Sequence, residues 1–414
     1  MEFKKYKLGE LGDICMCKRI MKAETAETGD VPFYKIGTFG GTPDVYISKE
    51  LFNTYKNKFS FPKVGDVLIS AAGTIGRSVI YNGEEAYFQD SNIVWIDNDE
   101  TKVLNSFLFY IYKNIRWKIS TGSTILRLYN DNIRETEIIV PNIEDQRSIS
   151  GFLSTIDDKI TLNTRMNAEL EAMAKQLYDY WFVQFDFPDE NGKPYKSSDG
   201  KMVYNETLKR EIPEGWEVKN LNQMVESFRG VTYNKEDLVL ESEDSILVLR
   251  GNNIPSSGQF AYDSNVAYIP KGMVSNEQRI NKGDIIITMS SGSKEHIGKC
   301  FMFQRDSDHT FGAFLSKFVP YEEYRYFVYL SMLSDFFKAF VKTTCNGTGI
   351  NNLTNDTFNN VYFPIPDANT LKVFESITGS LYNKVGLCQK QNNDLTHLRD
   401  SLLPMLMNGQ VIVE

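Results

Sequence analysis

Residues 121–131 read TGSTILRLYND, and residues 346–356, which lie 225 positions later, read NGTGINNLTND. At this offset residues 121–141 share six identities with the later copy, at Gly122, Ile125, Leu128, Asn130, Asp131 and Pro141. Self-similarity at a fixed distance indicates an internal repeat, and a repeat has to be recognised before a fold can be assigned.

An earlier block repeats at an offset of 218, because VGDVLIS at residues 64–70 resembles KGDIIIT at residues 282–288. The change of offset from 218 to 225 means seven extra residues in the second copy. The starts of the copies match at an offset of 210, which places Tyr6 on Trp216 and Leu8 on Val218. A solenoid would repeat every 20 to 50 residues or so, whereas about 200 residues can bury a core of their own. The sequence therefore predicts a duplicated two-domain unit.

The composition is typical of a globular protein, with 42% hydrophobic and 13% aromatic residues in a chain of 414. No apolar run approaches the roughly 18 residues of a membrane span, and no apolar signal segment follows the first lysines. We therefore expect a cytoplasmic protein with no membrane partner. The five cysteines are scattered and lack metal-ligand spacing, so we interpret them as reduced thiols and expect no metal site.

The net charge of −9 argues at first against a nucleic-acid partner. More than half of this deficit lies in residues 144–216, which hold 9 basic and 14 acidic side chains. A chain with this distribution could still bind duplex DNA if its basic surface is local or is supplied by a partner.

The sequence predicts an α+β fold, in which two similar strand-rich domains are joined by two long antiparallel helices related by a pseudo-twofold axis. Runs such as Val67–Ser70 and Ile285–Thr288 are β-rich and are separated by glycine and asparagine turns. Apolar stretches at Leu104–Ile119 and Tyr324–Val341 suggest helices within these domains. The expected parts are residues 1–141 (head 1), 142–184 (first long helix), 185–215 (connector loop), 216–366 (head 2) and 367–414 (second long helix).

Each long helix is expected to begin just after a proline, where Asn142 and Asp367 are good N-cap residues. Apolar residues then recur every three or four positions, which is a heptad pattern. Pro404 and Gly409 indicate the end of the second helix. The predicted seam residues are Ile149, Leu153, Ile156, Ile160, Leu170 and Leu177 in the first helix, and Phe374, Ile377, Leu381, Leu395, Leu398 and Leu402 in the second.

These helices could each pack on their own head or could pack on one another. We favour the second arrangement because both seams turn polar midway, at Asn163 and Asn167 in one helix and at Gln391 and Asn392 in the other. Antiparallel packing would bring the polar centres together, and polar seam residues can fix register at a cost in stability.

Motifs for catalysis are missing from the sequence. Gly292 and Gly298 are separated by five residues rather than the four of a P-loop, and Cys300 replaces the hydroxyl residue that would hold Mg²⁺. There is no Ser-His-Asp order and no metal-ligand cluster. We therefore expect a chain that is not an enzyme and carries no cofactor.

The heads instead offer glycine turns with short polar and basic side chains, a set that suits base edges and phosphates. Ordinary turn chemistry explains any one of these residues equally well, but as sets they favour a polar ligand. The pair Leu126-Arg127 in one copy faces Asn351-Asn352 in the other, which suggests diverged specificity. The candidate DNA-binding residues are Thr74, Arg77, Ser123, Thr124, Arg127, Arg250, Asn252, Asn253, Ser293, Lys294, Thr348, Asn351 and Asn352.

Over essentially its whole length the chain resembles the specificity (S) subunit of Type I restriction-modification enzymes. The resemblance rests on Thr-Gly-Ser at 121–123 and on four longer segments: IIVPNIEDQR at 138–147, LYDYWFVQF at 177–185, KMVYN at 201–205 and EIPEGWEV at 211–218. The second long helix departs from the pattern, because it starts without the Glu-Gln found at the start of the first.

This resemblance implies that each head is a target recognition domain that reads one half of a split sequence in double-stranded DNA. It implies two methyltransferase subunits and two motor-nuclease subunits as partners, with S-adenosylmethionine and ATP bound by them rather than by this chain. The acidic middle segment would then bind protein, and half-sites would lie about one turn of DNA apart. A restriction system with fused methylase and nuclease, and a two-headed scaffold that binds no DNA, remain as alternatives.

Overall fold

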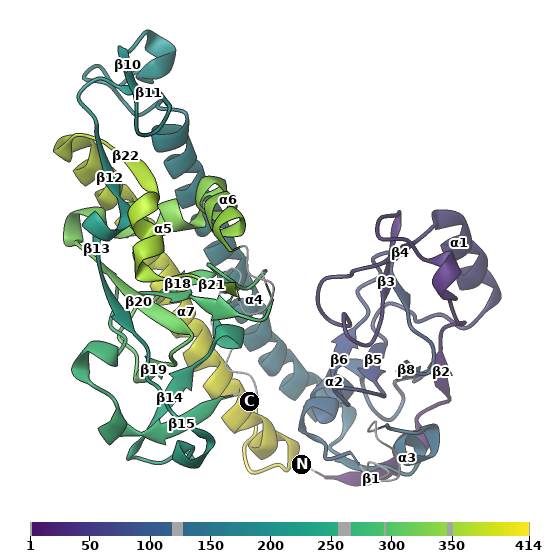
Figure 1. The fold of residues 1–414 in the computed structure, drawn as a ribbon. Coiled ribbons are helices and arrows are strands. Elements are labelled where there is room, and N and C mark those ends of the chain that lie inside the picture. Colours follow the sequence, from purple (N-terminus) through teal and green to yellow (C-terminus); the bar gives the residue numbers. More distant parts are fainter. Residues whose placement is uncertain (1, 118–126, 256–265, 294, 346–350, 414) are drawn as a thin grey trace. The chain divides into compact units, whose positions relative to one another are not determined.

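In the computed structural model, the described residues are 2–117, 127–255, 266–293, 295–345 and 351–413. The chain forms two compact units (Figure 1). Unit 1 consists of Met1–Lys159 with Asp394–Glu414, and unit 2 consists of Ile160–Asn393. Both boundaries fall inside the long helices α4 (Ile143–Tyr178) and α7 (Ala368–Met407). No helix in the described part of the chain is long and apolar enough to cross a membrane.

Head 1, in unit 1, is built from three small sheets. Strand β1 (Lys4–Lys7) pairs with β9 (Glu137–Val140). A four-stranded sheet has the order β2-β8-β5-β6, formed by Ile14–Met16, Ile93–Ile96, Val67–Ser70 and Ser78–Ile80. A three-stranded sheet has the order β4-β3-β7, formed by Tyr46–Ile47, Val31–Tyr34 and Tyr87–Phe88.

Head 2, in unit 2, repeats this topology strand for strand. Strand β12 (Glu217–Asn220) pairs with β22 (Tyr362–Ile365). The four-stranded sheet is β13-β20-β16-β18, from Val225–Arg229, Leu315–Pro320, Ile285–Thr288 and Cys300–Met302. The three-stranded sheet is β15-β14-β19, from Ala267–Pro270, Ser245–Leu249 and His309–Phe311. The sole parallel pairs between named strands in the described part of the chain are also equivalent, since β3 is parallel to β7 and β14 to β19. The predicted duplication and α+β class are confirmed.

The registers correct the sequence alignment of the two starts. Tyr6 pairs with Ile138 in head 1, and Lys219 pairs with Phe363, the equivalent of Ile138, in head 2. The true offset is therefore 213 rather than 210, and Tyr6 corresponds to Lys219. The apolar pattern favours the wrong register, because the true register places Lys219, which is not apolar, at the position of Tyr6.

The repeated Gly-Asp pair forms the same turn in both heads. Gly65 and Gly283 have φ of 96° and 91°, a backbone conformation that glycine adopts without steric cost. The following aspartate closes the turn with its side chain: Asp66 Oδ2 accepts from Lys63 N at 2.7 Å, and Asp284 Oδ2 accepts from Asn281 N at 2.8 Å. These identities maintain the backbone frame.

The shorter helices are α1 (Lys49–Lys58), α2 (Asn105–Asn114) and α3 (Asn130–Arg134) in unit 1, and α5 (Arg325–Leu333) and α6 (Asp335–Thr344) in unit 2. The apolar stretch over Tyr324–Val341 is helical, as expected, and it forms two helices because Ser334 is extended and its Oγ accepts from Phe337 N to cap α6. The connector contains local β structure, a hairpin of β10 (Met202–Asn205) and β11 (Arg210–Pro213).

The long helices begin as the sequence predicts. Asn142 Oδ1 accepts from Asp145 N at 2.9 Å, and Asp367 Oδ1 accepts from Thr370 N at 3.0 Å. The end of α7 lies between the two predicted signals: Pro404 is inside the helix, which continues to Met407, and Gly409 follows with a positive φ of 72°. Pro404 has no N–H to donate to the preceding turn, and the helix ends three residues beyond it.

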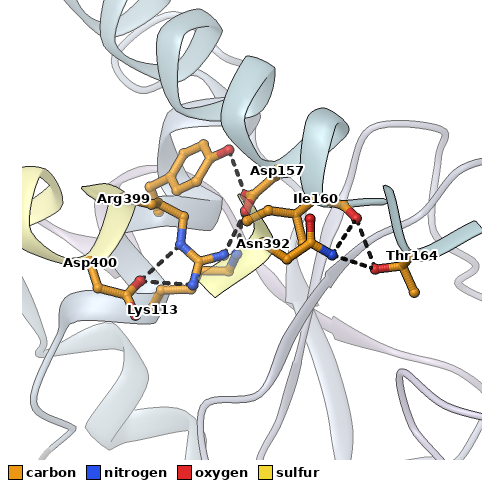
Figure 2. Close-up of polar contacts among 8 residues, drawn as sticks. Lys113, Asp157, Ile160, Thr164, Asn392, Arg399 and Asp400 are labelled. Atoms are coloured by element: carbon orange, nitrogen blue, oxygen red, sulfur yellow. Dashed lines mark hydrogen bonds and ion pairs between the residues drawn. The ribbon is translucent and has the colours of Figure 1, made fainter. Parts of the chain in front are cut away.

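Within unit 2 the two helices pack antiparallel through the expected polar centres. Asn163 Nδ2 donates to Asn392 Oδ1 at 2.9 Å and to Gln391 Oε1 at 3.2 Å. Asn392 Nδ2 donates in turn to Thr164 Oγ1 at 3.2 Å and to Ile160 O at 3.3 Å (Figure 2). Farther along α4, the Tyr178 ring contacts that of Phe374, near the start of α7.

Within unit 1 the helices are joined by an ionic cluster (Figure 2). Asp157 Oδ1 accepts from Arg399 Nη1 at 2.6 Å, and its Oδ2 accepts from the Tyr110 hydroxyl at 2.9 Å and lies 3.4 Å from Lys113 Nζ. Burial alone would raise the pKa of Asp157, but its hydrogen bonds and the two cations outweigh burial and lower it. This carboxylate therefore connects α2, α4 and α7.

The seam residues are buried or partly buried, with two exceptions. Ile377 is 41% exposed and Leu398 is 45% exposed, so neither lies on the buried seam, contrary to the prediction. Thr378 and Tyr382 are buried on that face instead. Thr378 follows Ile377, and a step of one residue rotates the side chain by about 100° around the helix. The prediction selects apolar residues and therefore passes over the threonine. The helices also pack on the heads, because Ile149 and Leu153 belong to the core of head 1 and Phe374 to that of head 2.

Each long helix caps a head helix with a side chain. Gln146 Oε1 accepts from Leu104 N, at the start of α2, at 2.9 Å. Head 2 uses Glu375, whose carboxylate accepts from Tyr326 N at 3.0 Å and from Phe327 N at 2.7 Å, in the first turn of α5. The second helix thus has no glutamine at the position equivalent to Gln146, and Glu375, four residues beyond that position, forms the cap instead. Burial raises the pKa of Glu375 to about 7, although the backbone donors and Arg325 act to lower it.

We expect the stability of unit 2 to fall as pH rises from 4.5, the ordinary value for Glu375, to about 7. Over this interval the folded state binds more protons than the unfolded state, so raising the pH favours unfolding. Urea denaturation of the wild type and of Glu375→Gln across this range measures the effect. The difference between the two proteins should change with pH; a constant difference would contradict the raised pKa.

The polar layer predicts a double-mutant cycle at Asn163 and Asn392. Either leucine substitution alone should destabilise the chain by about 1–3 kcal/mol, because the other amide stays buried without its partner. The double substitution should cost less than the sum of the two. Urea denaturation measures all four proteins, and strictly additive effects would contradict the pairing.

Candidate nucleic-acid interface

In head 1 the candidates Thr74 and Arg77 lie in the turn between β5 and β6. Ser70 Oγ donates to Thr74 O and accepts from Arg77 N at 2.9 Å, which fixes the turn from inside. Arg77 Nη1 donates to Phe39 O at 2.9 Å. Both Thr74 and Arg77 are exposed, so this turn presents a hydroxyl and a cation to solvent.

Arg127 lies beside this turn because it forms an antiparallel bridge with Ala72. Its Nη2 donates to Ser91 Oγ at 3.0 Å and to Ser91 O at 3.3 Å. The structure therefore brings Thr74, Arg77 and Arg127 to one region of head 1. The candidates Ser123 and Thr124 lie outside the described residues.

The same region of head 2 holds β17 (Ser290–Ser291) and β21 (Asn351–Asn352), which pair antiparallel. Ser290 pairs with Asn352, and its Oγ donates to Asn352 Oδ1 at 2.5 Å. The candidate Ser293 follows β17, and its N donates to Ser291 Oγ at 3.2 Å. Lys294 and Thr348 lie outside the described residues.

The remaining candidates, Arg250, Asn252 and Asn253, follow β14. Arg250 Nε donates to the Tyr233 hydroxyl at 3.0 Å, and Asn252 is exposed. Asn253 is only 4% exposed, and its Oδ1 accepts from Arg250 N at 2.9 Å. Asn253 therefore closes the turn and cannot contact a base, contrary to its selection as a candidate.

Sequence reasoning missed Lys299, Arg229 and Phe314. Lys299 takes the place of Arg77, because Lys299 O accepts from Thr288 N as Arg77 O accepts from Ser70 N, both at 2.9 Å. The sequence carried a signal for Lys299, since the Gly76-Arg77 and Gly298-Lys299 pairs match once the second copy is shifted. Arg229 and Phe314 have no sequence signal, because they become neighbours of Asn352 only through the sheet.

Arg229 and Phe314 line a hollow of about 470 Å³ in head 2 together with Ser290 and Asn352. Phe314 is 66% exposed, an unusual position for a large aromatic side chain. Among the described residues, the Arg229 guanidinium and the Asn352 amide nitrogen have no hydrogen-bond or ion-pair partner. The hollow combines a free cation, an amide, a hydroxyl and an aromatic face, which are the groups that read base edges.

No group of His, Cys, Asp and Glu side chains that could hold a metal ion occurs in the described ranges. A family model described as "Type I restriction modification DNA specificity domain" matches residues 1–172 and 213–397. The chain belongs to this family. It is a type I restriction specificity subunit with a role in DNA sequence recognition, and the two alternatives left open by its sequence are not favoured.

Two curated relatives show how far the similarity extends. The specificity subunit of the type I restriction enzyme MjaIX from Methanocaldococcus jannaschii is 26% identical over 457 aligned positions, covering 100% of this chain and 97% of that one. A Haemophilus influenzae chain, named as a candidate type I specificity subunit, is 53% identical over 177 residues. That second alignment covers 42% of this chain and 45% of the relative, so this chain spans less than half of that relative's length.

The fold has a solved counterpart. The crystal structure of a type I restriction-modification S subunit from M. genitalium superimposes with a TM-score of 0.56 at 16% identity, covering 98% of this chain and 96% of that one. This similarity supports the two-headed architecture.

Proposed function

We propose that this chain is a non-catalytic specificity subunit that recognises a bipartite target in duplex DNA, with one half-site read by each head. In this proposal it assembles with two methyltransferase subunits and two motor-nuclease subunits. S-adenosylmethionine and ATP would bind to those partners, and this chain would supply only the sequence information.

The observation that carries the proposal is the repeated frame with different side chains. Both heads close the same antiparallel bridge, Ala72 with Arg127 and Ser290 with Asn352. A frame that is kept while its side chains change suits two readers of the same kind of ligand with different preferences. Base edges in the major groove are such a ligand, because each base pair presents its own pattern of donors and acceptors.

The long helices offer surfaces for the partner subunits. In unit 2, Leu162 and Met173 on α4 are each 55% exposed, and Leu387 on α7 is 59% exposed. Leu162 and Met173 are eleven residues apart, about three helical turns, so they lie on one side of α4, a side that a partner subunit would cover. We therefore assign assembly to the helices and DNA recognition to the heads.

Methylation mapping tests the function directly. The chain is expressed with its methyltransferase subunit in a host that lacks adenine methylation, and the genome is sequenced for modified adenines. We expect one split motif, with two specified half-sites and an unspecified gap. A continuous motif, or no dependence of methylation on this chain, would refute the proposal.

A matched deletion tests whether the helices set the gap. Removing seven residues from each helix, 160–166 and 389–395, keeps the heptad pattern and shortens the pair by about 10 Å. This length corresponds to about three base pairs at 3.4 Å each. We expect both half-sites to persist with a shorter gap, measured by the same mapping.

The deletion of 160–166 alone is the control, because it leaves seven residues of α7 without partners. It should abolish methylation. An active double-deletion variant with an unchanged gap would contradict the role of the helices as a spacer.

A further inference from the structure

The two heads share their backbone hydrogen bonds around the Arg127 and Asn352 positions. Leu128 N donates to Ala71 O in head 1, as Leu353 N donates to Met289 O in head 2, both at 2.8 Å. Ala71 N donates to Asn92 O at 2.7 Å, and Met289 N donates to Phe314 O at 2.9 Å. With the two bridges, these bonds make three positions equivalent in the two heads: Ala72 with Ser290, Asn92 with Phe314, and Arg127 with Asn352. Ala313 precedes Phe314 as Ser91 precedes Asn92, although Ser91 has a positive φ of 48° and Ala313 does not.

In each head, the long polar side chain at this position, Arg127 or Asn352, forms a hydrogen bond with one serine. In head 1 the Ser91 hydroxyl and carbonyl both accept from Arg127 Nη2. In head 2 the Ser290 hydroxyl donates to Asn352 Oδ1. The two serines come from different positions, Ser91 from the turn before β8 and Ser290 from β17.

Each serine is replaced by alanine in the other head. Ala313 stands where head 1 has Ser91, and Ala72 stands where head 2 has Ser290. A guanidinium needs an acceptor, and Ser91 supplies two. An amide oxygen needs a donor, and Ser290 supplies one. The differences between the heads are therefore matched. Head 1 has Ser91 beside Arg127 and an alanine in place of Ser290, and head 2 has Ser290 beside Asn352 and an alanine in place of Ser91.

We infer that Arg127 and Asn352 are the specificity-determining residues of the two heads, with Ser91 and Ser290 as their positioning residues. Arg127 reads a guanine, through donors that match its O6 and N7, and Asn352 reads an adenine, through its amide at N6 and N7. This inference rests on the proposed function and deepens it by naming the bases and the side chains.

The hollow in head 2 supports reading of base edges rather than binding of phosphate alone. Phosphate contacts come from cations and from neutral polar side chains alike, and they position a protein without carrying sequence information, so it is the aromatic face beside Asn352 that distinguishes base reading. Asn352 is neutral, and its neighbour Phe314 is a large exposed aromatic side chain that suits a thymine methyl group. Arg229 adds a cation that head 1 lacks at the equivalent position, which is Met16 by the pairing of β2 and β13 with their neighbours.

The test exchanges the three matched residues within each head. Head 2 receives S290A, A313S and N352R, and head 1 receives A72S, S91A and R127N, each in the full chain with its methyltransferase subunit. Methylation mapping is the readout. We expect the head 2 variant to replace an adenine by a guanine in one half-site, with the other half-site unchanged, and the head 1 variant to do the converse in the other half-site.

A second variant covers the chance that a triple exchange disturbs folding. Asn352→Asp has the same shape and keeps the acceptor for Ser290, but it loses the amide donor. It should lower methylation of the wild-type motif by on the order of 10- to 100-fold, with the melting temperature of the complex unchanged. Lys196→Ala, an exposed lysine in the connector, is the control and should leave both the motif and the rate unchanged.

Unchanged motifs and rates in the exchange variants and in Asn352→Asp would overturn the inference while leaving the proposed function intact. A uniform loss at all sequences, with a smaller salt dependence of DNA binding, would also overturn it, because that result marks a phosphate contact. If the wild type itself methylates no split motif, the proposed function fails, and the inference fails with it.

Discussion

The architecture depends on one backbone constraint that is met twice, the antiparallel bridge that joins two segments far apart in the chain. Ala72 meets Arg127, and Ser290 meets Asn352, although 55 and 62 residues separate the partners. Closing such loops costs conformational entropy, and the sheet bonds around each bridge offset that cost. The glycine turns and the buried aspartates Asp66 and Asp284 fix the backbone near each bridge. The side chains at the bridge positions can therefore differ between the heads.

The long helices are held by polar contacts of two kinds. In unit 2 the amides of Asn163 and Asn392 pair, and in unit 1 Asp157 binds Arg399, Lys113 and Tyr110. Such contacts contribute less to stability than apolar packing would, but they permit few alternative registers. A pair of helices whose register is fixed keeps a fixed length, and this is the property that a spacer between two half-sites requires.

The sequence predicts the periodic parts of the fold well. The duplication, the helix starts at Asn142 and Asp367 and the pairing of the polar centres can all be read from spacing, because each depends on a short and local pattern. The seam at Ile377 and Leu398 could not be read in the same way, since the neighbouring polar residues Thr378 and Arg399 turn inward instead. The alignment of the starts failed for a related reason, because the true register matches Tyr6 to Lys219 and a search for apolar residues passes over a lysine.

The candidate site was predictable only in part. Arg77, Arg127 and Asn352 stand in glycine-rich segments that the repeat marks out. Arg229, Phe314 and the serine partners become neighbours only when strands pair, and no spacing rule in one sequence reveals that. Asn253 shows the opposite error, because an asparagine that suits a base by its chemistry is used to close its own turn.

The most direct measurement is a structure of the full chain with its methyltransferase subunits, bound to a duplex that carries the mapped motif. We expect Arg127 to lie within hydrogen-bonding distance of a guanine edge in one half-site and Asn352 to lie within the same distance of an adenine edge in the other. A complex in which both side chains face solvent, or contact phosphates only, would contradict this expectation.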